Sequence, residues 1–386
     1  MKILKIAFSG LPLVKDKGEI DFTASQRVKD DDELSFLFKN GKNGYYSNNV
    51  ISFIGLNASG KTSILKILSF AFSLLNNEPL NNTKYLELFD GLKEEGEAIF
   101  EVCFLSSNAI YFLTTTIARK EKKLFITHES LKEKSCKSIK KKNDLFNRNN
   151  AKTIMERKDN EAFLSDDVSI MIAFNKQHQD KVLYIDMLKY TNENHLALSE
   201  NCPVELIAFF DPSIEYINVQ QAGKDKIISL KFHKKPEIKL NRINDVERYL
   251  SSGTIKGINL FLSAFEAFLN GEYLLIDELE NHFNHEIVST LLRFYMNNKI
   301  NVAGATLLFS THYAELLDQF KRNDCIYVVR NINGIFIENL SKILKRNDIK
   351  KSDAYQSDFL KGTAPQYGAY IALKNKLLMD GVKQNG

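Results

Sequence analysis

The stretch "FIGLNASGKTSILKIL", residues 53–68, decides the fold of this chain. An apolar, strand-like run meets a loop with two glycines, and apolar residues at helical spacing follow the loop. The spacing Gly55-x-x-x-x-Gly60-Lys61-Thr62 is that of a phosphate-binding loop, and it lies in the strand–loop–helix context that such a loop requires. The sequence therefore predicts a site for the phosphates of a nucleotide.

Each part of this loop has a predicted chemical role. The glycines let the backbone N–H groups approach and surround a β-phosphate, and the following helix adds its positive N-terminal end. Lys61 is expected to reach the β- and γ-phosphate oxygens, and the Thr62 hydroxyl to ligate Mg²⁺. The predicted nucleotide-binding residues here are Gly55, Asn57, Ala58, Ser59, Gly60, Lys61, Thr62 and Ser63.

A second motif, "YLLIDELE" over residues 273–280, places two carboxylates directly after a buried strand. The carboxyl ends of parallel strands are where such sheets bind ligands. We therefore expect Asp277 to be the Mg²⁺ partner and Glu278 to be the general base that polarises the attacking water. His312 follows another buried strand in "LLFSTHYAELL", where a histidine can be catalytic or structural.

A third motif, "LSSGT" over Leu250–Thr254, opens a long apolar helix that should stop at Gly271. A Ser-Ser-Gly turn at a helix start offers N–H groups and hydroxyls to an anion, although taken alone it is more typical of an ordinary helix N-cap. Ser251, Ser252 and Gly253 are the candidate phosphate contacts.

Composition sets the broad class of this chain. It has 386 residues, 44% hydrophobic and 26% charged, which is typical of a soluble globular protein. No apolar stretch is long enough to span a bilayer, and the N-terminus lacks a secretory pattern, so we expect a cytoplasmic protein without membrane contact. The four cysteines are scattered, which argues against a metal or disulfide framework.

The positive charge of the chain is concentrated in residues 119–158. This segment holds 14 Lys and Arg against 5 Asp and Glu, whereas the remainder holds 38 basic and 43 acidic residues. It is rich in Lys and Asn and poor in periodic apolar residues, so we interpret it as a partly mobile excursion from the fold. It either contacts nucleic-acid phosphates or is a solvated insertion or a docking strip for an acidic partner.

Strand and helix patterns alternate along the chain. Residues 2–8 and 18–24 read as a hairpin, and residues 97–116 read as two antiparallel strands around "SSN". After residue 245, strands alternate with helices, which favours a mostly parallel sheet covered on both faces. The fold class is therefore α/β.

The order of the motifs carries a family resemblance. Gly55–Thr62, Leu250–Thr254, Leu274–Glu278 and His312 resemble the Walker A, signature, Walker B and switch histidine of ABC-type ATPases. Leu279–Asn284 resembles the D-loop of the OLD-like, RecF-related prokaryotic group. Residues 358–373, "DFLKGTAPQYGAYIAL", resemble the ending of bacterial AAA-type ATPases from abortive-infection loci.

The match to this family is incomplete in two places. Ser252 stands where the usual signature has Gly, and Thr254 where it has Gln or Glu. The glutamine of the Q-loop has four candidates, which are Gln177, Gln179, Gln220 and Gln221.

The resemblance implies an architecture. It is an ABC-type ATPase head with a mixed sheet, an antiparallel N-terminal β subdomain, helices on both faces and a helical, basic insertion. The expected parts are an N-terminal ATPase lobe over residues 1–118, an insertion and middle region over 119–244, and a C-terminal ATPase lobe over 245–386.

The resemblance also implies a mechanism. Two subunits meet head to tail, with Walker A of one facing the signature of the other and ATP and Mg²⁺ between them. Ser251 and Gly253 then contact the γ-phosphate across the interface, and His312 holds the phosphate and the attacking water. ATP joins the subunits and hydrolysis releases them, as in other γ-phosphate switches.

Three functions fit these motifs to different degrees. A transporter subunit is disfavoured, because Leu250 follows Thr62 by 188 positions, about twice the family's usual separation. A RecF-like DNA-binding ATPase in repair or recombination is the alternative. The favoured function is the sensor ATPase of an anti-phage or toxin–antitoxin-like system, which controls a separate effector. OLD-like nucleases carry a Toprim domain after the ATPase, and because only 74 residues follow His312 here, we expect that this chain is not itself a nuclease.

Overall fold

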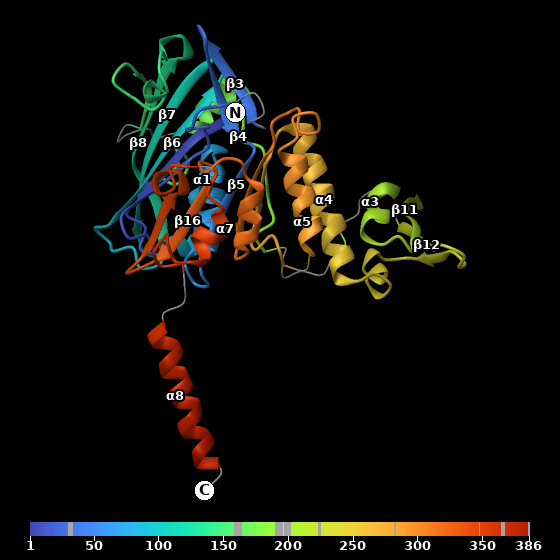
Figure 1. The fold of residues 1–386 in the computed structure, drawn as a ribbon. Coiled ribbons are helices and arrows are strands. Elements are labelled where there is room, and N and C mark those ends of the chain that lie inside the picture. The colour runs from blue at the N-terminus through green and yellow to red at the C-terminus, as the bar shows by residue number, and fades with distance from the viewer. Residues whose placement is uncertain are drawn as a thin grey trace.

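A six-stranded sheet forms the centre of the molecule (Figure 1). The computed structural model describes residues 1–29, 34–157, 164–189, 196, 202–222, 225–281, 283–346, 348–363 and 367–384. The strand order is β10-β14-β15-β5-β16-β17, and every neighbouring pair is parallel except β16 with β17. The strands are β10 (Tyr184–Asp186), β14 (Tyr273–Ile276), β15 (Thr306–Thr311), β5 (Val50–Ile54), β16 (Ile326–Asn331) and β17 (Ile335–Asn339). This confirms the predicted α/β fold with its mixed, mainly parallel sheet.

The central sheet is covered on both faces. Ile51 and Phe53 of β5 join a core with α1 (Lys61–Leu75), whereas Val50 and Ile54 join a second core with α4 (Ser252–Asn270) and α5 (His285–Tyr295). Successive side chains of a strand point to opposite faces, so a continuous apolar run such as "VISFI" is what a strand buried on both sides needs. The helices predicted after the phosphate loop and before Gly271 are both present.

A second six-stranded sheet packs over the α1 side of the central sheet (Figure 1). Its order is β2-β1-β6-β7-β8-β9, and all of its pairings are antiparallel. The strands are β1 (Lys2–Ser9), β2 (Lys17–Asp21), β6 (Glu97–Ser106), β7 (Ala109–Lys120), β8 (Lys123–Ser135) and β9 (Lys152–Glu156). The hairpin predicted in residues 2–24 and the strand pair predicted in 97–116 are confirmed.

The basic segment 119–158 differs from the expected excursion. Most of it belongs to this sheet through the end of β7 and through β8 and β9, with the short 3₁₀ helices η3 (Cys136–Ser138) and η4 (Lys142–Asp144) between them; residue 158 lies outside the described part of the chain. Leu124, Ile126 and Leu131 are buried, while most of the lysines remain at the surface. Cys136, Ile139 and Leu145 join a second, smaller core with Phe112, so a few apolar residues order the segment although it is rich in lysine.

A three-stranded sheet lies at the far end of α4 (Figure 1). It consists of β11 (Ile214–Ala222), β12 (Asp225–Phe232) and β13 (Ile238–Leu240), with α3 (Val204–Phe210) before it and η6 (Ile243–Arg248) after it. Phe210 packs so closely on α4 that a Cβ on Gly257 would lie 2.1 Å from its ring. The unit formed by α3 and this small sheet therefore packs directly against α4, the helix that begins at the signature-like motif.

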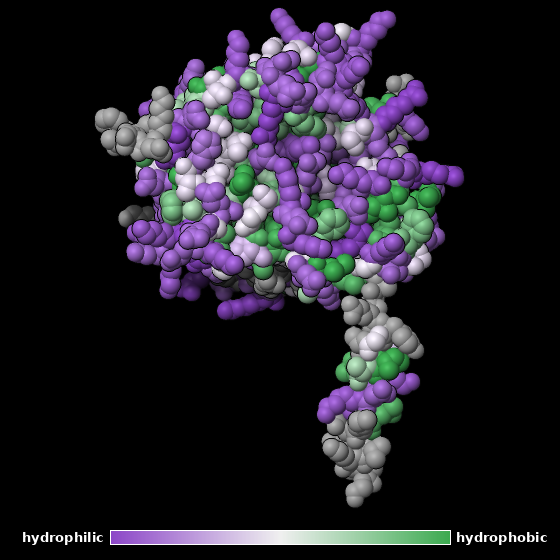
Figure 2. Space-filling view, turned by 90° about the vertical axis from the view of Figure 1, so that its left-hand side faces the viewer, coloured by the Kyte–Doolittle hydropathy of each residue, from purple (hydrophilic) through white to green (hydrophobic). Residues whose placement is uncertain are grey.

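The remaining elements connect these layers. They are β3 (Leu34–Asn40), β4 (Asn43–Asn48), η1 (Leu80–Asn82), η2 (Leu86–Phe89), α2 (Met171–His178), η7 (Ala314–Gln319), α6 (Leu340–Ile343), α7 (Lys351–Gln356) and α8 (Tyr367–Gln384). The 3₁₀ helix η7 follows His312. α8 stands clear of the body (Figures 1 and 2) and exposes Leu373, Leu377 and Leu378. Within the described ranges, no helix combines the length and apolarity required to cross a membrane.

Candidate functional site

The loop between β5 and α1 is shaped by its glycines. Gly60 is the N-cap of α1 and has a φ of 100°, a left-handed conformation that favours glycine. Gly55 lies against a neighbouring strand, where an added Cβ would be 2.3 Å from the backbone oxygen of Val329. The two glycines of the motif thus meet two separate requirements, a left-handed turn and a close backbone approach.

Lys61 begins α1 and turns back over the loop. Its Nζ donates to the carbonyl oxygens of Gly55 at 3.0 Å and Leu56 at 3.1 Å, and it lies 3.2 Å from Nδ1 of His312. Burial lowers the pKa of Lys61, and nearby carboxylates oppose that shift. The structure therefore brings the predicted phosphate-binding lysine and the predicted switch histidine into direct contact.

Thr62 and Asp277 meet at the carboxyl edge of the central sheet. The Thr62 hydroxyl donates to Oδ2 of Asp277 at 2.7 Å, and Ser310, from the end of β15, donates to Oδ1. Hydroxyl and carboxylate oxygens are the hard ligands that Mg²⁺ prefers, and this ion is usually held by only one or two carboxylates together with phosphates and water. Thr62 and Asp277 fit that pattern, although no cluster of three His, Cys, Asp or Glu side chains suited to a metal occurs among the described residues.

Glu278 is held in an unusual backbone conformation, with a φ of 48°. Its N–H donates to the Ser310 hydroxyl at 2.7 Å. Its carboxylate lies 3.1 Å from Nε2 of His312 and accepts a hydrogen bond from Nδ2 of Asn281. Burial on its own would raise the pKa of Glu278, but the hydrogen bonds from His312 and Asn281 outweigh it and hold that pKa below its ordinary value. The carboxylate is therefore ionised at neutral pH, as the predicted role of general base requires.

The contacts of His312 define its tautomer. A protonated lysine only donates hydrogen bonds, so Nδ1 of His312 must accept from Lys61. The ring proton then lies on Nε2, which donates to Oε1 of Glu278. Lys61, His312 and Glu278 form a continuous chain of hydrogen bonds.

These residues line an open pocket of about 720 Å³. Two of its walls carry no recognisable nucleotide-binding motif: the loop after β1, and the turn between β16 and β17. Ile335 joins the walls, since its N–H donates to the Leu13 carbonyl at 2.8 Å, and Asn331 reaches the Ala58 carbonyl at 3.3 Å. The sequence "NING" at residues 331–334 is typical of a hairpin turn, but it does not indicate that the loop after β1 packs against this turn. The lining residues are Pro12, Leu13, Asn57, Ala58, Ser59, Gly60, Lys61, Thr62, Ser63, Glu278, His312, Asn331, Asn333, Gly334 and Ile335.

The signature-like motif lies outside this pocket. Ser251 caps α4, because its Oγ accepts a hydrogen bond from the Thr254 N–H at 3.0 Å. Ser251 and Ser252 are exposed, and Gly253 is half-buried. Within one subunit the motif is thus an N-cap, and its contact with a γ-phosphate across a dimer interface stays a prediction. The four Q-loop candidates also lie away from the pocket, in or beside α2 and on β11.

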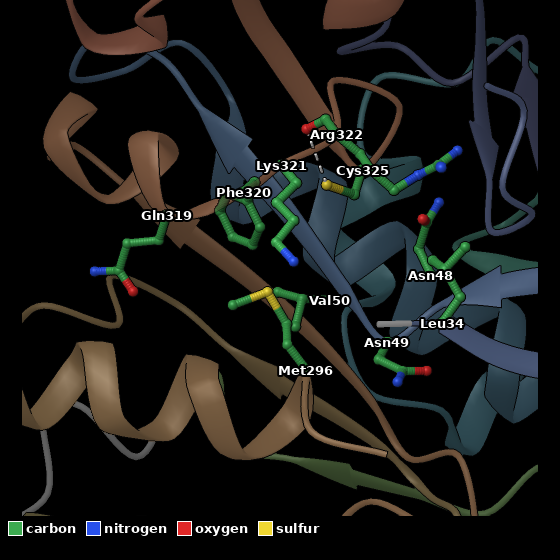
Figure 3. Close-up of a pocket in the computed structure, with 10 residues that line it drawn as sticks. All are labelled: Leu34, Asn48, Asn49, Val50, Met296, Gln319, Phe320, Lys321, Arg322 and Cys325. Carbon is green, nitrogen blue, oxygen red and sulfur yellow. Dashed lines mark hydrogen bonds between the residues drawn. The ribbon is translucent and has the colours of Figure 1, made fainter. Parts of the chain in front are cut away.

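A smaller hollow of about 50 Å³ lies at the opposite end of β5, beside Val50 (Figure 3). Cys325 lines it, and its Sγ is 3.6 Å from the Arg322 carbonyl oxygen. The volume is far below the roughly 300 Å³ or more of typical ligand pockets. The hollow is also at the amino end of the parallel strands, away from the edge where such sheets bind ligands.

The fold and the site together define a P-loop ATPase domain. A phosphate-loop strand and helix, an acidic strand end and a third strand end with a histidine meet at one edge of a mainly parallel sheet. The family model described as "AAA domain, putative AbiEii toxin, Type IV TA system" matches residues 50–318, more than half of the chain. The chain therefore belongs to this family. No curated protein matches the chain.

Proposed function

We propose that this chain binds and hydrolyses ATP with Mg²⁺, as a nucleotide-dependent switch in the cytoplasm. The observation that carries the proposal is one pocket lined by Lys61, Thr62, Glu278 and His312, with Asp277 hydrogen-bonded to Thr62 behind it. These residues come from three separate strand ends of one sheet. The reaction is ATP plus water to ADP plus phosphate.

Each side chain has a defined part in this reaction. Lys61 and the loop N–H groups bind the β- and γ-phosphates. Thr62 and Asp277 would hold Mg²⁺, which would supply positive charge next to the phosphate oxygens. Glu278 accepts a hydrogen bond from the attacking water and orients it toward the γ-phosphorus. His312 orients Glu278 through its Nε2 proton.

The switch depends on a second copy of the chain. Ser251, Ser252 and Gly253 are remote from their own pocket, and the two serines are exposed, so they are available to the nucleotide of another subunit. ATP then joins two subunits head to tail, in the manner of the OLD-like, RecF-related ATPases that the motifs resemble.

The biological setting that we propose is anti-phage defence of the abortive-infection or toxin–antitoxin type. The family description supports this setting, and its words "putative AbiEii toxin" link the AAA domain with the toxin itself. Our proposal instead places the damaging activity on a separate effector that the ATPase controls. Expressing the chain alone in a bacterium discriminates the two, because growth arrest that depends on Lys61 would identify the chain as the toxin.

A DNA-binding, RecF-like role is the second candidate, supported by the basic surface around η4. Lys140 and Lys141 are exposed, whereas Nζ of Lys142 donates to the carbonyls of Ala24 and Gln26. Reversing the charge of Lys140 and Lys141 therefore tests phosphate binding without disturbing the fold. DNA affinity that does not change would exclude this surface as a nucleic-acid contact.

The ATPase proposal is tested with purified protein and two variants. Lys61→Ala should abolish ATP binding, and Glu278→Gln should bind ATP without turning it over. Copurification of the native operon products with and without ATP should then reveal the effector. Equal ATP turnover by wild type and Lys61→Ala would refute the proposed activity.

A further inference from the structure

Glu280 is a buried carboxylate just beyond the strand that carries Asp277. It is 6% exposed, and its Oε1 accepts a hydrogen bond from the backbone N–H of His312 at 2.6 Å. Its Oε2 is buried and has no hydrogen-bond partner in the described part of the chain. A single backbone amide is thus the only hydrogen-bond donor that this part of the chain offers to the carboxylate.

Packing alone does not account for a carboxylate in this position. Burying a charged group is unfavourable unless hydrogen bonds or an opposite charge compensate for it, and a neutral side chain would avoid that loss. A charged acceptor, however, binds an N–H group more strongly and at a shorter distance than a neutral one. The Glu280 carboxylate therefore binds the backbone N–H of His312 more firmly than a neutral acceptor would.

The position of the His312 main chain matters because its ring hydrogen-bonds to two side chains at once. The ring lies 3.2 Å from Nζ of Lys61 on one side and 3.1 Å from Oε1 of Glu278 on the other. His312 also follows the last residue of β15, where the ladder of strand hydrogen bonds ends. The hydrogen bond from the His312 N–H to Glu280 fixes the main chain directly after the end of that ladder.

We propose that Glu280 is a positioning residue for ATP hydrolysis, which fixes the backbone of His312 and so presents its ring between Lys61 and Glu278. Glu280 does not line the nucleotide pocket, so it acts through His312 and not on the substrate. This inference rests on the proposed ATPase function. It predicts a loss of turnover with little change in ATP affinity.

The first test compares Glu280→Ala with Glu280→Gln. We expect alanine to lower kcat by about 10- to 100-fold, as misplaced catalytic groups do, with KM for ATP changed less than about threefold. Glutamine keeps an oxygen that accepts from the His312 N–H, so it should retain kcat to within about fivefold. Glu266→Ala, at an exposed glutamate of α4, is the matched control and should keep wild-type kinetics.

A double-mutant comparison separates positioning from a general loss of stability. If Glu280 acts through His312, adding Glu280→Ala to His312→Ala should lower kcat no further. A further loss as large as the loss in the wild-type background would overturn the proposal. So would wild-type kcat in Glu280→Ala itself.

An NMR measurement keeps the proposal testable if the chain does not hydrolyse ATP. With ¹⁵N-labelled histidine, the chain has only seven labelled residues, and His312 is assigned by its loss in His312→Gln. We expect Glu280→Ala to shift the His312 amide upfield and to change the tautomer signature of its ring, and Glu280→Gln to preserve the ring signature. Equal ATP turnover by wild type and Lys61→Ala would refute the proposed function, whereas an unchanged His312 amide and ring in Glu280→Ala would overturn the positioning role.

Discussion

Replacing Glu278 by glutamine removes the negative charge of the predicted base and leaves its shape unchanged. In the wild type both carboxylate oxygens accept hydrogen bonds, one from Nε2 of His312 and one from Asn281. Glutamine offers one oxygen and one NH₂ group, so its oxygen can still accept from His312. Asn281 can turn its own amide oxygen toward the new NH₂ group. The hydrogen bonds survive, and the fold should be unaffected.

The expected loss of rate follows from the missing charge. A positioned general base contributes roughly 10²- to 10⁴-fold, which corresponds to about 3 to 5 kcal/mol of barrier height. Affinity for ATP should change little, because Lys61, Thr62 and the loop N–H groups are intact. The variant should therefore accumulate the ATP-bound state.

Single-turnover hydrolysis of radiolabelled ATP measures this rate, and a fluorescent ATP analogue measures affinity. Asn281→Ala is the matched control: it removes one hydrogen bond to the carboxylate but keeps its charge, so it should lower the rate less than Glu278→Gln. Turnover of Glu278→Gln within a few-fold of the wild type would refute the assignment of Glu278 as the base.

Four further predictions concern stability, binding and assembly. Burial raises the pKa of Asp21 from 3.8 to about 6, so between these two pH values the native state keeps a proton on Asp21 that the unfolded state has lost, and wild-type stability falls as pH rises from about 4 to 6. Asp21→Asn removes this loss, so it should raise the free energy of unfolding in urea by roughly 1–3 kcal/mol at about pH 8 and by almost nothing near pH 4. Gly55→Ala forces a Cβ to 2.3 Å from the Val329 backbone oxygen, so it should abolish nucleotide binding in a titration and lower the melting temperature. Ser251→Ala removes a helix cap and should destabilise the fold by about 1 kcal/mol. Ser252→Ala should leave stability within about 0.5 kcal/mol and weaken ATP-dependent self-association in sedimentation.

The loop and the acidic strand end were predictable because their signals are local. Gly55, Gly60 and Lys61 lie within seven consecutive residues, and Asp277 and Glu278 directly follow a buried strand. The central sheet then brings them together, since the carboxyl ends of β5, β14 and β15 lie at one edge. Thr62 and Asp277 are 215 positions apart in sequence and in hydrogen-bond contact.

Other parts of the site depend on contacts that no local pattern reveals. Ser310 links Asp277 to the Glu278 amide, but in sequence it is one polar residue at the end of an apolar strand. Leu13 and Asn331 form pocket walls only because the loop after β1 pairs with the turn before β17. Strands β8 and β9 were missed for a related reason, since a sheet with one solvated face needs only alternate apolar residues and tolerates many lysines.

The contacts of Lys61 connect the predicted phosphate-binding lysine to Glu278, the predicted base. An ammonium group has three protons, and Lys61 has three acceptors, which are the carbonyls of Gly55 and Leu56 and Nδ1 of His312. A phosphate oxygen bound by Lys61 must replace or share one of these acceptors. If it replaces His312, the ring loses its donor on Nδ1 while Nε2 still contacts Glu278. We therefore expect a change of acceptor at Lys61 to alter the hydrogen bonding of Glu278, because a single imidazole ring joins these two side chains.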